Sequence, residues 1–106
     1  MSARESLERL IRAVERGEAV EAQFAEVFPD DEFHEAVEAF GGSLDAARST
    51  HYALLPGWRW SKTALGRVRV FQDRGPWFEA DAPNPARAWL LAILRAKLAR
   101  QEITQE

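Results

Sequence analysis

The stretch from residue 41 to residue 60 constrains the fold of this chain more than any other, because the hydrophobic period changes within it. Gly41-Gly42 ends one helical pattern, and Ser43 begins the next, in which apolar residues recur three or four positions apart. Pro56-Gly57 is a turn signal that stops this helix. Apolar and polar residues alternate after it, which is typical of a β-strand. The chain is therefore expected to pass from helices to a sheet at residue 56.

Helical patterns fill the chain before this turn. The expected helices cover residues 2–17, 18–28, 31–40 and 43–55. The first begins with a capping box, because the side chains of Ser2 and Glu5 can each accept a backbone N–H at the helix start. Asp30 or Asp31 is expected to cap the third helix.

Three short strands and a closing helix are expected after the turn. Strand-like alternation occurs near residues 58–61, 67–71 and 77–80, and strands this close in sequence pair as an antiparallel meander. Asn84 as N-cap and Pro85 at the first helical position begin a last helix with a broad apolar face. Its Trp89 is expected in the core, together with Trp58 and Trp60.

These patterns predict the α+β class. We expect one domain over residues 1–106, with a helical part at 1–55, an antiparallel sheet at 56–82 and a C-terminal helix at 84–101. A chain of 106 residues is long enough to bury a core. Because a small sheet with aromatic side chains needs cover, we expect a small α/β/α sandwich in which the N-terminal helices and the C-terminal helix divide the faces of the sheet.

The chain resembles a family of small proteins of unknown function that phages and prophages encode, whose domain is described as an α-β-α (ABA) sandwich. The resemblance rests on the helix start Gly-Gly-Ser-Leu-Asp-Ala-Ala at 41–47, on Leu55-Pro56-Gly57-Trp58 followed by Trp60, and on the helix entry Asn84-Pro85-Ala86-Arg87-Ala88. With the N-terminal helix it covers most of the chain. The resemblance implies a phage or prophage origin and work inside a bacterial host, and it brings no catalytic residues with it.

Composition disfavours several classes of function. The sequence has no cysteine, which excludes disulfides and cysteine-based zinc sites and is compatible with a reducing cytoplasm. Its longest strongly apolar run, at residues 88–94, is too short to cross a bilayer. Phosphate-binding loops, dinucleotide fingerprints and a GxSxG motif are missing from the sequence. His34 and Glu38 are too few for a stable metal site, and His51 is a lone imidazole. We therefore expect a protein that is not an enzyme and uses no metal or cofactor. With the bacterial host that the resemblance implies, its expected location is the cytoplasm of the bacterial host cell.

Charge is distributed unevenly along the chain. Residues 1–42 have a net charge of −7, whereas residues 43–106 have a net charge of +4. Such a dipolar domain can be steered toward a charged partner, although glutamates on helices are also ordinary solvated residues. The acidic candidates for partner binding are spaced three residues apart on the third helix, at Glu32, Glu35 and Glu38. Such a row of carboxylates can occupy a basic groove that normally holds nucleic acid.

The basic candidates for partner binding lie on the expected sheet and its turns. They are Arg59, Arg67, Arg69 and Arg74, accompanied by Trp77 and, on the same strand face, Phe71. Arginines beside aromatic rings are found on surfaces that bind single-stranded nucleic acid, and also at the hot spots of protein interfaces. The third possibility is that the last helix covers this face, so that its aromatic side chains belong to the core.

The phage or prophage origin that the resemblance implies, together with small size, missing catalytic groups and uneven charge, favours a protein-binding module, whose partner is a host or phage protein. One concrete form is an inhibitor of a host nucleic-acid machine, such as an anti-CRISPR protein or an inhibitor of RNA polymerase. Direct nucleic-acid binding through the arginine face is the alternative, although a net charge of −3 argues against it. A minor virion or assembly component is a third hypothesis. No membrane partner is expected.

Overall fold

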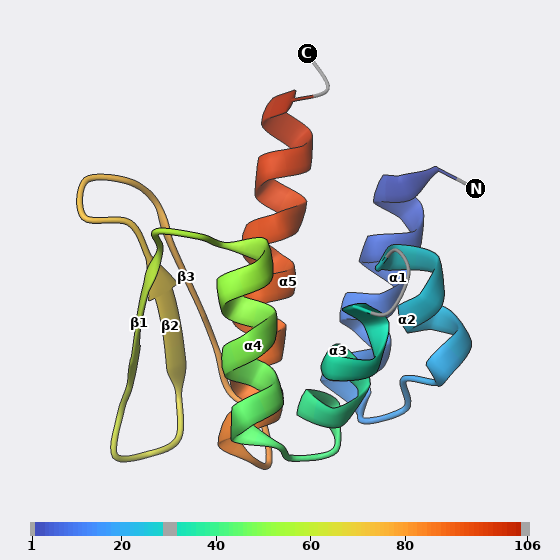
Figure 1. The fold of residues 1–106 in the computed structure, drawn as a ribbon, viewed down its shortest axis with the longest axis horizontal. Coiled ribbons are helices and arrows are strands. Elements are labelled where there is room, and N and C mark those ends of the chain that lie inside the picture. Colours follow the sequence, from blue (N-terminus) through green and yellow to red (C-terminus); the bar gives the residue numbers. More distant parts are fainter. Residues whose placement is uncertain (1, 29–31, 105–106) are drawn as a thin grey trace.

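The computed structural model describes residues 2–28 and 32–104, except the side chains of 32 and 102–104. Along these residues the elements are α1 (Ala3–Arg16), α2 (Glu21–Val27), α3 (Glu32–Phe40), α4 (Leu44–Leu54), β1 (Arg59–Lys62), β2 (Val68–Phe71), β3 (Trp77–Ala80) and α5 (Pro85–Thr104). The predicted α+β class is confirmed, and so is the predicted order of N-terminal helices, sheet and C-terminal helix (Figure 1).

The helix ends follow from the capping chemistry in the sequence. Ser2 Oγ accepts the backbone N–H of Glu5 at 3.1 Å, which is one of the two bonds of the predicted capping box. The Glu5 carboxylate accepts the Ser2 hydroxyl at 3.1 Å. Gly17 closes α1 with a φ of 73°, a left-handed conformation that glycine adopts without strain. Asn84 Oδ1 accepts the backbone N–H of Arg87 at 2.8 Å and thereby starts α5 where it was predicted.

The second helix is shorter than predicted. It begins at Glu21 rather than at residue 18, because the Gln23 side chain accepts the backbone N–H of Val20 at 3.0 Å and so caps the helix there. The predicted caps of the third helix, Asp30 and Asp31, lie outside the described residues.

The three strands form an antiparallel sheet in the order β1-β2-β3. Residues that are paired directly across strands project from the same face of a sheet. The inner face, which is turned toward the helices, carries Trp60, Lys62, Val68, Val70, Phe78 and Ala80. The outer face carries Arg59, Ser61, Arg69, Phe71, Trp77 and Glu79. Side chains alternate between buried and exposed along β2, which shows directly that the helices cover only one face.

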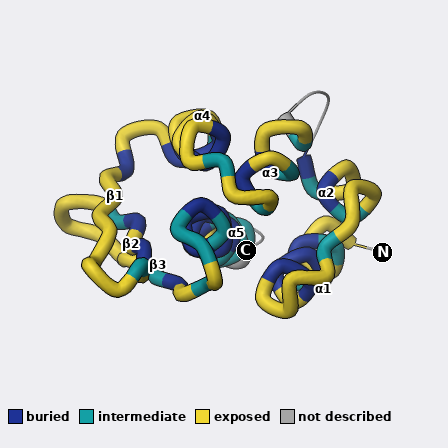
Figure 2. Tube along the Cα trace, turned by 90° about the horizontal axis from the view of Figure 1, so that it is seen from below, coloured by how far each residue is buried: buried dark blue, intermediate teal, exposed yellow. Residues whose placement is uncertain are grey.

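The described helices all lie on one side of the sheet. Helix α5 packs on β2 and β3, while α1, α3 and α4 surround α5 on its other sides (Figures 1 and 2). The layers are therefore the sheet, then α5, then the N-terminal helices, whereas we had expected the sheet to lie in the middle. The composition of the two faces explains this order. The buried aliphatic side chains of the strands, Val68, Val70 and Ala80, all lie on the inner face, which is the face that the helices cover.

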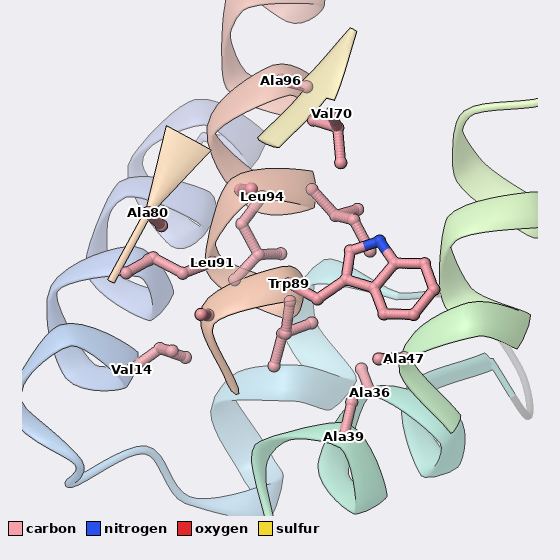
Figure 3. Packing of buried hydrophobic residues seen from close by; sticks show 14 of the residues in the cluster. Val14, Ala36, Ala39, Ala47, Val70, Ala80, Trp89, Leu91, Leu94 and Ala96 are labelled. Carbon is pink, nitrogen blue, oxygen red and sulfur yellow. The ribbon is translucent and has the colours of Figure 1, made fainter. Parts of the chain in front are cut away.

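Helix α5 is the centre of the core. It is buried on most sides between Ala86 and Ala96, as a helix with a broad apolar surface should be. Small side chains let the other helices approach it closely. Figure 3 shows Trp89 extending from α5 toward α4, with Ala47 of α4 and Ala36 of α3 beside it. The broad apolar face predicted for the last helix is therefore confirmed.

One of the three predicted core tryptophans is not buried. Trp58 and Trp89 are buried, as predicted, but the side chain of Trp60 is 40% exposed. The prediction for Trp60 is wrong because β1 is an edge strand, and nothing among the described residues covers the ring from outside. Its ring packs on that of Trp89, with the centroids 4.0 Å apart. Leu44 and Tyr52 of α4 are exposed as well.

His51 is fully buried and connects α4 to α5 and to the turn before β1. Trp89 donates its indole N–H to His51 Nδ1 at 3.2 Å, so the imidazole proton lies on Nε2. From Nε2 it is donated to the carbonyl oxygen of Trp58 at 3.0 Å. Burial lowers the pKa of His51 below its ordinary value, and the hydrogen bond to Trp58 opposes this shift only in part. The geometry gives this histidine a structural role.

Candidate binding face on the sheet

The outer face of the sheet is open to solvent. Four of the predicted partner-binding residues are brought together on it or at its border, namely Arg59, Arg67, Arg69 and Trp77. The possibility that the last helix covers this face is wrong, because α5 packs against the opposite face (Figure 2). Trp77 is 53% exposed, and Phe71 beside it is half-buried. The face therefore presents aromatic surface to any partner that docks on it.

Each of these arginines is held by a carboxylate. Arg67 is bound in a fork by Asp81, with its Nη2 at 2.9 Å and its Nε at 3.1 Å from the carboxylate oxygens. Arg69 Nη2 lies 3.2 Å from Glu79, which also lies 3.6 Å from Arg67. A bidentate pair of this kind fixes the plane of the guanidinium. The arginines of the sheet are thus held in defined positions.

The pairing with Arg67 shifts the pKa of Asp81. The hydrogen bond from Arg67 and the positive charge of Arg67 lower the pKa of Asp81, and burial opposes this shift. The same bond raises the pKa of Arg67 above its ordinary value. Both groups therefore stay charged at neutral pH, and the pair stays intact.

The guanidinium groups also lie against aromatic rings. The Arg69 guanidinium is 4.3 Å from the centroid of the Trp77 ring, within the range of a cation–π contact. The Arg59 guanidinium lies 5.9 Å from the Phe71 ring and also pairs with Asp73 at 3.1 Å. Arg69 is therefore held both by the Glu79 carboxylate and by the indole of Trp77.

A shallow cleft of about 280 Å³ lies on this face near the turn between β2 and β3. It is lined by Ser61, Arg69, Phe71, Gln72, Asp73, Gly75 and Trp77. Its lining includes both polar and aromatic side chains, and its volume suits one or two side chains of a partner rather than a large ligand.

Reasoning from the sequence found the arginines but missed the acids that neutralise them, which are Asp73, Glu79 and Asp81. The register between β2 and β3 identifies two of these acids. Once the turn at residues 73–76 pairs Phe71 with Trp77, Arg69 must lie directly opposite Glu79. Asp81 follows two residues later on the same face, within reach of Arg67. Aligning the two strands on their turn would have identified both pairs.

The remaining predicted residues lie elsewhere. Arg74 is exposed in the turn between β2 and β3 and forms no ion pair with the described residues. Glu35 and Glu38 are exposed on α3, which lies on the far side of α5 from the sheet (Figure 1). The side chain of Glu32 is outside the described part of the chain. The acidic and the basic candidates therefore do not form a single surface.

Metal sites and membrane-spanning helices were also considered for the part of the chain that the structure describes. No group of three or more potential metal ligands gathers there. None of its helices combines the length and the apolar character that crossing a membrane requires. Comparisons of the chain with protein-family models, with curated proteins and with solved structures gave no match. The surface chemistry described above is therefore the basis for assigning a function.

Proposed function

We propose that this chain is a non-enzymatic protein-binding module that docks its partner on the outer face of the sheet. The observation that carries the proposal is the arrangement around Trp77. Its half-exposed indole lies against the Arg69 guanidinium, and the Glu79 carboxylate also binds that guanidinium. Tryptophan and arginine are the residues most enriched at the energetic centres of protein interfaces. Here they are held in place before any partner arrives, which lowers the entropy lost on binding.

The charge balance of the face favours a protein partner over nucleic acid. Its three arginines are paired with three carboxylates, so they contribute little net positive charge. Binding a phosphate would require an arginine to leave its carboxylate, or the carboxylate to lie close to the phosphate. Nucleic-acid binding depends on an excess of positive charge, which these pairs remove. A partner with both donors and acceptors fits this surface better.

The size of the sheet limits how the partner docks. Strands of four residues are about 13 Å long, and three of them are about 10 Å wide between the outer strands. A stable interface covers roughly 800 Å² on each protein. The partner is therefore expected to extend beyond the strands onto the turn that carries Arg74, at the rim of the contact.

One specific form of this proposal is an inhibitor of a host nucleic-acid machine, such as a CRISPR complex or RNA polymerase. It is supported by the phage resemblance and by the exposed carboxylates of Glu35 and Glu38, which are well separated from the sheet. In that form the acidic helix α3 supplies a second contact. Its involvement would appear as a loss of inhibition when both glutamates are changed to lysine.

The test is capture of partners from a bacterial host lysate by the tagged full chain, with and without nuclease. Trp77→Ala is compared with Val20→Ala, a matched control at an exposed side chain on the connection between α1 and α2. We expect a stoichiometric protein that resists nuclease, retained by the control and bound at least about 30-fold more weakly by Trp77→Ala. Recovery that disappears with nuclease would instead indicate nucleic-acid binding. Equal binding by both variants would contradict the docking surface.

A further inference from the structure

The two edges of the sheet differ in the contacts that they make with the rest of the molecule. At the β3 edge, Arg95 of α5 donates to the backbone carbonyl of Glu79 at 2.7 Å and also pairs with Glu15 of α1 at 2.7 Å. No described residue covers the β1 edge in this way. The N–H of Thr63 donates to the carbonyl of Arg67, so alternate residues of β1 turn their backbone groups toward β2. The residues between them turn theirs outward.

These outward-facing residues are Trp60 and Lys62. No other described segment forms a hydrogen bond with their backbone groups. An uncovered edge of this kind is a template on which another strand can pair. Sheets usually protect such an edge. Among the described residues, a side chain binds an outward backbone carbonyl at the β3 edge, at Glu79, but none does so at β1. The uncovered β1 edge is therefore a candidate site for pairing with a strand of another chain.

A groove lies beside this edge, between β1 and α4. Its volume is about 320 Å³, and it is lined by Leu44, Asp45, Arg48, Trp60, Lys62, Val68, Pro85 and Trp89. Figure 2 shows α4 and β1 next to each other around α5. The rings of Trp60 and Trp89, with centroids 4.0 Å apart, form an aromatic surface in this groove, and Leu44, which is 48% exposed, lies on the α4 side. The groove is therefore apolar inside and bordered by unpaired backbone.

The charges that border the groove are also unpaired. Arg48 on α4 and Lys62 on β1 form no ion pair with the described residues, in contrast to the arginines of the outer face. The Arg48 guanidinium lies 5.6 Å from the ring of Tyr52, which leaves its charge uncompensated. Asp45 is the one carboxylate among the lining residues. The groove thus has an excess of positive charge, which an acidic occupant would balance.

We propose that this groove binds an extended acidic segment of a partner protein, which adds to β1 as a fourth strand. Strand addition takes its affinity from the edge backbone and its specificity from alternate side chains. Trp60 and Lys62 both project from the inner face, so the two partner residues opposite them are separated by one residue. The residue opposite Trp60 is apolar, and the residue opposite Lys62 is acidic. This site is separate from the outer face and does not depend on it.

The proposal is tested with a surface-displayed library of random 12-residue peptides, selected on the immobilised full chain. We expect the selected peptides to share an acidic residue two positions from an apolar one. The best of them, synthesised as the probe, is then titrated onto variants. Lys62→Glu and Trp60→Ala should each weaken binding at least tenfold. Arg74→Glu reverses a charge in the turn between β2 and β3, outside the residues that line the groove, and should leave the affinity within twofold.

Two further variants separate backbone pairing from charge. Lys62→Ala removes the charge and keeps the outward N–H, whereas Lys62→Pro removes both, so the proline variant should bind more weakly. Circular dichroism checks that both fold. Hydrogen exchange provides a direct readout, because the bound peptide should slow exchange at the amides of Trp60 and Lys62, while Ser61 is already paired with β2.

The proposal would be overturned by selected peptides without acidic residues, by full affinity in Lys62→Glu, or by unchanged exchange at Trp60 and Lys62. A concentration-dependent dimer of the free chain that Lys62→Pro abolishes would also overturn it, because a second copy would then occupy the edge. Since the outer-face variant Trp77→Ala is expected to retain the peptide, failure here is distinguishable from failure of the proposed function.

Discussion

The inner and outer faces of the same three strands differ in what holds their side chains in place. On the inner face, Val68, Val70 and Ala80 are buried against α5. On the outer face, each arginine is fixed by a carboxylate, and Trp77 remains half exposed. The first arrangement stabilises the fold through apolar burial, whereas the second contributes little to stability because surface ion pairs are weak. An ordered surface that adds little stability is what a preformed docking site requires.

The largest expected effect compares tryptophans on the two sides of the sheet. Trp89→Ala should lower the free energy of unfolding by about 3–5 kcal/mol, because it leaves a cavity in the core and removes the hydrogen bond to His51. Trp77→Ala should lower it by about 1 kcal/mol or less, since the ring is half exposed. Urea denaturation of the two variants measures both values. Losses of similar size would show that the outer face is part of the core.

An intermediate effect is expected at Trp60, which lies between these extremes. Its ring packs on Trp89 but remains partly in water, so Trp60→Ala should cost about 1–2 kcal/mol of unfolding free energy. Leu65→Ala, at an almost fully exposed position between β1 and β2, serves as the control and should change stability by less than about 0.5 kcal/mol. A loss at Trp60 as large as that at Trp89 would restore the core assignment made from the sequence.

The free energy of unfolding is expected to change gradually with pH because of His51, which connects α4 to α5 and to the turn before β1. Because the folded-state pKa of His51 is lowered, the unfolded chain binds more protons as the pH falls through the unfolded value near 6.5. The contribution of His51 to stability is therefore present above that pH and is lost as the pH falls toward the folded pKa. Urea denaturation between pH 5 and pH 8 measures this slope.

The control for the pH effect uses the second histidine of the chain. In His34→Gln the slope attributable to His51 should persist, and the one remaining imidazole can be followed by NMR to read its pKa directly. A His51 pKa above the ordinary value would reverse the sign of the slope and contradict the neutral, buried imidazole.

Much of the fold could be predicted from the sequence because its signals are local. The capping box at Ser2, the turn at Pro56-Gly57 and the helix start at Asn84 each act within a few residues, and each lies where it was predicted. The order of the layers is not local. It depends on which face of the sheet needs cover, and that depends on the pairing of the strands. The exposure of Trp60 was missed for the same reason, because aromatic composition does not reveal that a strand lies at an edge.

The candidate site was predicted only in part. The alternation along β2 identified Arg67 and Arg69 as neighbours on one face, but their partners Glu79 and Asp81 come from another strand and required the register. The groove beside β1 could not have been found from the sequence. It exists only because tertiary packing brings α4 alongside the edge strand, so that residues of α4 and β1 line the same groove.

The most direct test of the central claim is an NMR map of the surface that the captured partner covers. The partner is titrated onto the ¹⁵N-labelled chain, and changes in the amide and indole signals are recorded. If the outer face is the docking surface, the largest changes will occur along β2 and β3 and at the indole N–H of Trp77, and any changes at Glu35 and Glu38 on α3 will be smaller. Changes centred on α3, with the Trp77 indole unaffected, would contradict the claim.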